Sequence, residues 1–400
     1  MKKIKVIIAC ILCIIMVMPA NVVSVSASDI CENTNESDIG QKVIECAKKW
    51  IEMSEPNQGI NKINVEKIYN IATHSYNYTV SYYADLVDYG YIIIGIDSGE
   101  PYVVEAMVDK GVKGIRKHLE ETIDNIDNYG IKAELVEIAP LRYGIVAKEG
   151  KDSSNGVIID DRGELLQYVD YGNATFDDVG DVIIESMPSD MYKIDQTSVK
   201  WLPKFAKKHK LFSLKETAMA TGLYACGPQA LLQISFMEGL YIENEYELTP
   251  NAFLTREYGS LWNMTNTKYT GKTNSIGLIY YKLGEGSMKD AVNGYVKYVK
   301  SKKCTNNAVI KEYSSLADIK NGLKTNKSML MGYGIIDKDG KRKGHFVSIL
   351  GYKEAVEISS GNKYSYLAVA DGWNENVAYI NFKYAKEFKD YQVAYFNIIH

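Results

Sequence analysis

The chain has 400 residues, of which 46% are hydrophobic and 24% charged. This is the composition of a globular protein, and at roughly 100–200 residues per domain the length predicts two domains. The net charge of −4 argues against the nucleic-acid-binding class, because phosphate contacts need a clearly basic surface. The two halves have opposite signs: residues 1–200 carry 19 Lys and Arg against 32 Asp and Glu, and residues 201–400 carry 27 against 18.

Residues 1–27 are predicted to be a signal peptide. Three lysines precede an apolar run over residues 6–18, and small or aliphatic side chains follow at Val25 and Ala27, as before a cleavage site. A membrane anchor is an alternative, but the run is shorter than the roughly 20 residues that span a bilayer. A second alternative, lipid attachment at Cys10, leaves too short a hydrophobic region before the cysteine. We expect a secreted, extracellular protein with no transmembrane segment after signal cleavage.

The segment 28–172 is predicted to be an acidic α+β domain. Its apolar spacing and turn residues predict helices over 40–53 and 112–128 and strands over 76–83, 90–96, 102–107, 135–147 and 156–160. Residues 173–200 lose this periodicity and contain Asn, Asp, Pro and Ser, so we expect them to form a linker.

The segment 201–400 is predicted to be a second α+β domain that begins with helices and ends with strands. A helix is expected to begin at Cys226, because Gly227-Pro228 suits a first helical turn and apolar residues follow at helical spacing. Further helices are expected over 287–301 and 314–326, and strands over 329–336, 344–352, 364–370 and 379–382.

Four cysteines remain after signal cleavage: Cys31, Cys46, Cys226 and Cys304. They are too few for a disulfide scaffold. Cys31 and Cys46 are close enough in sequence to pair, with burial of Cys46 on a helix face as the alternative, and Cys304 is predicted to be a surface thiol. Residues 28–400 contain no CxxC, HExxH or paired-histidine spacing, which argues against a zinc site. We expect no metal and no cofactor.

Cys226, His345 and Asp371 are the predicted catalytic residues. A cysteine nucleophile needs a thiolate, an imidazole that takes its proton and a polar group that orients the imidazole. At a helix start, Cys226 would meet the positive end of the helix dipole, which favours the thiolate. His345 opens an apolar strand, and Asp371 follows the next strand, where a hairpin would bring its carboxylate close to the imidazole. Asn374 and Asn376 are alternatives for the orienting group.

Three segments resemble motifs of papain-like cysteine peptidases: Ala225-Cys226-Gly227-Pro228-Gln229-Ala230-Leu231, Gly344-His345-Phe346-Val347 and Asp371-Gly372-Trp373. The resemblance covers about residues 200–395 and is closest to the bacterial branch related to bacteriocin-leader-processing peptidases. A weaker similarity to streptopain-like peptidases lies at Ala230 and Gln233-Ile234, and residues 89–97 resemble the pro-segments of that group. The resemblance implies a papain-like domain with a nucleophile helix packed on an antiparallel sheet.

The resemblance also implies an activity. We expect a secreted cysteine peptidase that acts on peptides or proteins and is made as a precursor, in which the acidic N-terminal domain docks on the basic domain and inhibits it. Acyl transfer to an amine uses the same residues and is an alternative outcome. A second hypothesis is a non-catalytic exported binding or adhesion protein, because 31 tyrosines suit a recognition surface.

Position 220 departs from the family pattern. Papain-like peptidases commonly have a glutamine six residues before the nucleophile, where its amide donates to the oxyanion, and Ala220 stands there in this chain. Loss of one oxyanion donor costs roughly 10²–10³ in turnover. Thr217, Thr221 and Tyr224 are the nearby side chains that can donate. We expect Thr221 or a backbone amide to replace the glutamine.

Overall fold

The computed structural model describes a defined part of the chain: residues 35–54, 59–71, 73, 75–120, 123, 132–148, 155–160, 165–170, 180–183, 192–198, 211–241, 246, 249–276, 279–336, 342–357, 363–373, 375–383 and 391–400. The predicted signal peptide, Cys31 and Asn374 lie outside these residues. None of the described helices is both long and apolar enough to cross a membrane.

The chain divides into two units, one formed by Met1–Val103 with Lys113–Met187 and the other by Val104–Val112 with Pro188–His400. The last of the three boundaries along the chain, between residues 187 and 188, lies inside the predicted linker. That linker is not free of secondary structure, since it contains β9 (Gly180–Ile183), which pairs with β1 (Lys62–Asn70), and β10 (Tyr192–Ser198), which pairs with β16 (Arg342–Glu357). Strand pairing uses backbone groups, so these short strands need no apolar periodicity.

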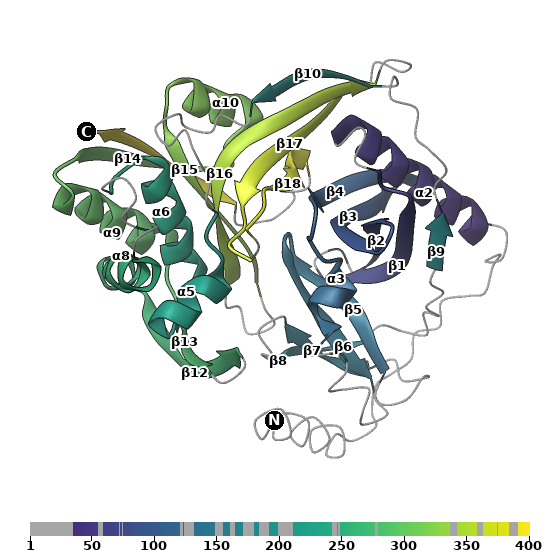
Figure 1. Cartoon of the computed structure of the whole chain (residues 1–400), viewed down its shortest axis with the longest axis horizontal. Coiled ribbons are helices and arrows are strands. Elements are labelled where there is room, and N and C mark those ends of the chain that lie inside the picture. Colours follow the sequence, from purple (N-terminus) through teal and green to yellow (C-terminus); the bar gives the residue numbers. More distant parts are fainter. Residues whose placement is uncertain are drawn as a thin grey trace. The chain divides into compact units, whose positions relative to one another are not determined.

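The first unit combines a long helix with a mainly antiparallel sheet (Figure 1). The hydroxyl of Tyr82 donates to the carbonyl of Ala47 and joins the sheet to the helix. The helix predicted over 40–53 and the strands predicted over 76–83, 90–96 and 102–107 are confirmed. Its elements are α2 (Asn35–Ser54), β1, β2 (Ser75–Ala84), β3 (Val87–Asp97), part of β4 (Glu100–Val108), α3 (Ile115–His118), β5 (Lys132–Ala139), β6 (Arg142–Lys148), β7 (Asn155–Asp160), β8 (Leu165–Asp170) and β9.

The single strand predicted over 135–147 is wrong. These residues form the hairpin of β5 and β6, in which Leu135 pairs with Ile145 and the turn places Leu141 at a φ of 57°. The turn residues are apolar and buried, so their hydropathy does not distinguish them from the residues of a buried strand. The predicted helix over 112–128 is described over Ile115–His118, and most of its later part lies outside the described residues.

The second unit is built on an antiparallel sheet of strand order β14, β19, β15, β16, β17, β18, accompanied by a small sheet of β11, β13 and β12 (Figure 1). The chain is thus confirmed as α+β. The elements are β10, α5 (Leu214–Thr221), β11 (Leu223–Tyr224), α6 (Cys226–Met237), α8 (Pro250–Met264), β12 (Lys268–Ile276), β13 (Ile279–Glu285), α9 (Met288–Ser301), β14 (Thr305–Glu312), α10 (Leu316–Lys324), β15 (Ser328–Ile336), β16, β17 (Lys363–Ala370), β18 (Ala378–Asn381) and β19 (Gln392–Ile399).

Serine side chains set two of the predicted helix starts. Ser287 caps α9 by accepting from the N–H of Asp290, and Ser315 caps α10 in a capping box with Asp318. A serine at this position satisfies amide groups that have no partner inside the helix. The helices therefore begin just after these serines, close to the predicted boundaries.

Helices cover both faces of the second unit's sheet. On one face, Leu330 and Phe396 join the apolar side chains of α6, α8 and α9 in one large core. On the other face, Met329 and Tyr395 contact Gly322 of α10. Neighbouring residues of a strand point to opposite faces, so β15 contributes to both layers. The first of these layers carries Cys226.

Candidate active site

Cys226 is the first residue of α6, and its position is held by a buried tyrosine. The preceding residue, Ala225, has an extended backbone and no side-chain oxygen to cap the helix. Its N–H donates to the hydroxyl of Tyr258 over 2.8 Å, and its carbonyl accepts from the same hydroxyl over 3.1 Å. Burial holds the pKa of Tyr258 well above its ordinary value, so this hydroxyl stays protonated. The half-buried thiol of Cys226 thus stands at a helix N-terminus that no side chain caps.

The first turns of α6 pack against the start of β16. A Cβ built at Gly227 would lie 3.5 Å from the ring of Phe346, and the hydroxyl of Ser348 donates to the carbonyl of Ala230 over 2.7 Å. Phe346 and Ser348 therefore face the helix. Phe346 directly follows His345, and Ser348 stands three residues after it. The fold therefore brings the Cys226 and His345 motifs together.

His345 is buried, with 2% of its surface exposed. It pairs across the sheet with Tyr333, and its ring centroid lies 5.1 Å from that of Trp373. Its Nε2 lies 2.7 Å from the backbone oxygen of Asp371 and accepts from the indole N–H of Trp373 over 2.8 Å. The imidazole is thus held from the turn that follows β17.

The two partners of Nε2 favour different tautomers of His345. An indole N–H can only donate, so Trp373 bonds Nε2 when the proton of the neutral ring is on Nδ1. A carbonyl can only accept, so the Asp371 oxygen bonds Nε2 when Nε2 carries the proton. Only in the second tautomer is Nδ1 unprotonated, as a base that takes the proton of a thiol must be. The turn therefore influences whether His345 is able to act as a base.

Asp371 contacts His345 through its backbone carbonyl, whereas the predicted contact was through its carboxylate. The side chain is 1% exposed, and its Oδ1 accepts from the backbone N–H of Trp373 over 3.0 Å. This bond closes the turn that carries the indole. Asn376, the second predicted alternative, donates from Nδ2 to Asp109 over 2.6 Å. Trp373 was missed as a site residue, although it stands two residues after Asp371 in the aspartate motif.

The thiol of Cys226 makes no hydrogen bond to His345 within the part of the chain that the structure describes. Phe346 faces α6, and because side chains alternate along a strand, the side chain of His345 leaves β16 on the opposite face. The structure thus brings His345, Asp371 and Trp373 together and places Cys226 on the adjoining helix end without a bond between thiol and imidazole.

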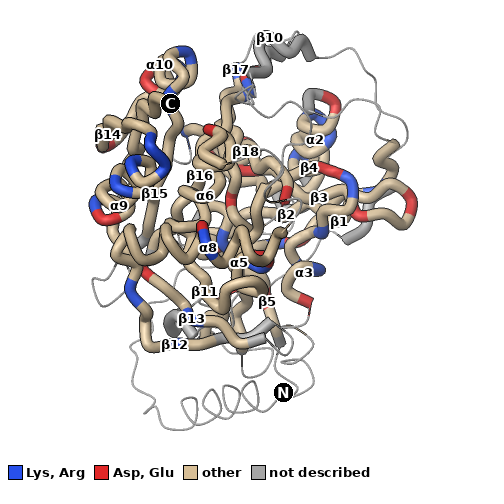
Figure 2. The backbone as a smooth tube through the Cα atoms, turned by 60° about the vertical axis from the view of Figure 1, so that its left-hand side comes forward, with Lys and Arg blue, Asp and Glu red and all other residues tan. Residues whose placement is uncertain are grey.

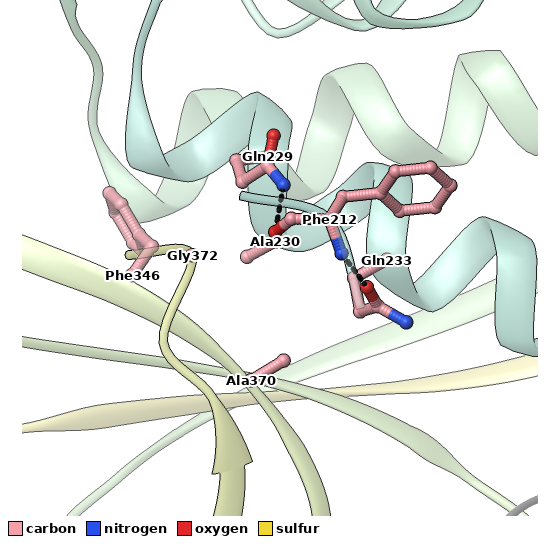
Figure 3. Close-up of a pocket in the computed structure, with 7 residues that line it drawn as sticks. All are labelled: Phe212, Gln229, Ala230, Gln233, Phe346, Ala370 and Gly372. Carbon is pink, nitrogen blue, oxygen red and sulfur yellow. Dashed lines mark hydrogen bonds between the residues drawn. The ribbon is translucent and has the colours of Figure 1, made fainter. Parts of the chain in front are cut away.

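A pair of glutamines ties these elements together (Figure 3). Gln229 and Gln233 lie one helical turn apart on α6. Nε2 of Gln229 donates to the carbonyl of Phe212 over 2.5 Å. Oε1 of Gln233 accepts from the backbone N–H of Phe212 over 3.0 Å. The backbone N–H of Leu214 in turn donates to the carbonyl of Gly372 over 2.5 Å. This glutamine clamp connects the helix of Cys226 to the turn of Asp371.

A small pocket lies beside the clamp, and Figure 3 shows its side chains between α6 and the strands. It is lined by Phe212, Gln229, Ala230, Gln233, Phe346, Ala370 and Gly372. Gly372 has a φ of 78°, and a Cβ there would lie 3.2 Å from Gln229. A residue without a side chain therefore suits this turn, both for its backbone conformation and for its close approach to the helix.

No protein-family model and no curated protein matches this chain significantly. The functional assignment therefore rests on the residues themselves.

The threonines near Ala220 do not offer a free donor. The hydroxyl of Thr221 donates to the carbonyl of Thr217 over 2.6 Å, and the hydroxyl of Thr217 donates to the carbonyl of Leu214 over 3.1 Å. The ring of Tyr224 stacks on Tyr281. The backbone N–H of Cys226 is different, because the first amides of a helix have no partner inside it. In a papain-like site this amide is the donor that the glutamine joins, so it does not take the place of the glutamine missing at position 220.

Proposed function

We propose that this chain is an exported cysteine peptidase with a papain-like second domain, in which Cys226 is the nucleophile. One observation carries the proposal: the start of α6 meets the start of β16 and the turn after β17 around one pocket, although α6 lies more than 100 residues before both of them in sequence. These segments carry Cys226, His345 and Asp371. The packing of α6 on an antiparallel sheet supports the papain-like arrangement.

The proposed reaction begins with proton transfer from the Cys226 thiol to Nδ1 of His345. The thiolate attacks the carbonyl carbon of a peptide bond, and the backbone N–H of Cys226 donates to the oxyanion that forms. His345 then gives its proton to the leaving amine, and water hydrolyses the acyl-enzyme. The backbone carbonyl of Asp371 accepts a hydrogen bond from Nε2–H and so favours the tautomer in which Nδ1 is unprotonated.

The reaction requires the thiol and the imidazole to come into contact. Catalytic hydrogen bonds are often long before substrate binds and tighten in the complex. We propose that the ring of His345 meets the thiol only when substrate is bound.

The test is hydrolysis of a denatured protein by the full chain and by Cys226→Ala. We expect this substitution, and His345→Ala, to abolish hydrolysis while the far-ultraviolet circular dichroism stays unchanged. Cys304→Ala is the matched control and should keep wild-type activity. Hydrolysis by Cys226→Ala at the wild-type rate would exclude Cys226 as the nucleophile.

A second function is favoured by two specific observations, the absence of a thiol–imidazole bond among the described residues and the alanine at position 220. In this alternative the chain is an exported binding or adhesion protein on the same scaffold. A peptidyl electrophile separates the two functions: covalent labelling of Cys226 that is lost in His345→Ala supports the peptidase, and absence of labelling in the wild-type chain supports the binding protein.

A further inference from the structure

A second thiol–imidazole pair lies outside the pocket described above. Sγ of Cys304, just after α9, lies 3.7 Å from Nδ1 of His400, just after β19. The other ring nitrogen of His400, Nε2, lies 3.8 Å from Oε2 of Glu238 at the end of α6. Thiol, imidazole and carboxylate thus stand in series, and three separate elements supply them.

The carboxylate of this series is fixed in place. Glu238 is 8% exposed, and its Oε1 accepts from the hydroxyl of Ser328 on β15 over 2.5 Å. Its backbone N–H donates to the carbonyl of Ile234 over 2.9 Å. A carboxylate held in this way orients the imidazole of His400.

The thiol is both positioned and accessible. The backbone N–H of Cys304 donates to the carbonyl of Val299 over 3.3 Å, and the preceding residue, Lys303, has a φ of 62°. Cys304 is half-buried and His400 is exposed. A small reagent is therefore able to reach Sγ from the side of the imidazole.

The thiol of Cys304 donates to the backbone carbonyl of Lys302 over 3.6 Å and has the imidazole of His400 beside it. Figure 2 marks the basic residues along α9 and the loop after it, which contains Lys302 and Lys303. Lys302 is paired with Glu257 over 2.6 Å. From α9, Tyr295 adds no negative charge, because burial holds its pKa well above its ordinary value. The imidazole of His400 is therefore the group placed to take the proton of the Cys304 thiol.

We propose that Cys304, His400 and Glu238 form a thiol-modification site that reacts with low-molecular-weight disulfides. The Cys304 thiolate attacks one sulfur of the disulfide, a mixed disulfide forms, and the sulfur–sulfur bond of the reagent breaks. The other sulfur of the reagent leaves as a thiolate and takes a proton from His400. The protein thiol is oxidised to the mixed disulfide, so no further oxidant is needed.

The test uses the full chain carrying Cys226→Ala, so its outcome is independent of the proposed peptidase activity. The probe is an aromatic disulfide that releases a coloured thiolate, and peptide mapping by mass spectrometry identifies the modified cysteine. We expect Cys304 to be modified at neutral pH. Cys46 is the internal reference and should stay unmodified, because burial raises the pKa of its thiol to about 12.

His400→Ala should lower the rate of Cys304 modification at pH 7 about tenfold, because it removes the base that is placed to take the thiol proton. The difference should disappear near pH 10, where hydroxide takes this proton instead. His118→Ala, which removes another exposed histidine, is the control and should react at the wild-type rate. Equal rates for His400→Ala and wild type at pH 7, or a tenfold loss that persists at pH 10, would overturn the proposal.

Discussion

The indole N–H of Trp373 donates to Nε2 of His345 over 2.8 Å, and the same nitrogen lies 2.7 Å from the backbone oxygen of Asp371. One ring nitrogen thus has a donor and an acceptor beside it. The neutral imidazole satisfies one of them at a time, so the turn after β17 sets the balance between two tautomers of His345.

We expect Trp373→Phe to shift this balance. Phenylalanine keeps an aromatic ring against His345 but has no N–H, so the tautomer with the proton on Nε2 should gain. Ring-nitrogen chemical shifts of His345 measured by NMR check this, and the other histidines serve as the control. If the proposed mechanism holds, kcat rises as well, because Nδ1 is unprotonated in a larger share of the molecules. An unchanged tautomer ratio would contradict the competition between Trp373 and Asp371.

The glutamine clamp is expected to contribute to stability. Gln229→Leu removes the donor to the carbonyl of Phe212, which then stays buried without that partner, at a cost of about 1–3 kcal/mol in the free energy of unfolding. Urea denaturation measures this cost. Gln41→Leu, on an exposed helix position, is the control and should change the free energy by less than about 0.5 kcal/mol. A Gln229→Leu variant as stable as wild type would show that the clamp contributes nothing.

Glu257 should make stability depend on pH. Burial alone would raise the pKa of this carboxyl, but hydrogen bonds from Lys302, Tyr298 and Arg256 outweigh it and hold the pKa below its ordinary value. A depressed pKa in the folded state means that the stabilisation is complete above the unfolded pKa and is lost as the pH falls through the folded pKa. Acidification should therefore weaken this contribution.

The matching experiment compares wild type with Glu257→Gln. At pH 7 the substitution should lower the free energy of unfolding by about 1–3 kcal/mol, because it removes a charge that accepts three hydrogen bonds. Below about pH 4 the difference should shrink. Urea denaturation at the two pH values measures it, and a difference that grows on acidification would contradict the assignment.

The opposite charges of the two halves predict salt-dependent inhibition. After signal cleavage, residues 28–200 carry 16 basic and 32 acidic residues, whereas residues 201–400 carry 27 and 18. Attraction between exposed charges is screened beyond about 8 Å at physiological salt. Hydrolysis of an uncharged peptide by the full chain should therefore become faster as sodium chloride is added. A rate that is independent of salt would argue against electrostatic docking of the acidic half.

Several elements could be predicted because their signals are local. The helix at Cys226 followed from Gly227-Pro228 and its apolar spacing, and those at Met288 and Leu316 begin just after Ser287 and Ser315. α8 was missed, although Pro250 at its first position and the spacing of its apolar residues were both in the sequence. These buried residues are Phe253, Leu254, Tyr258, Leu261 and Trp262.

By itself the sequence determined the α+β class, the helix that begins at Cys226 and the strand that carries His345, because helix starts and strand periodicity depend on residues a few positions apart. Only the tertiary structure decided which atoms meet. It paired His345 with the carbonyl of Asp371 and the indole of Trp373, and it placed Cys304 beside His400 and Glu238. Such contacts join residues from different elements, and the packing of those elements depends on the whole core rather than on any local pattern.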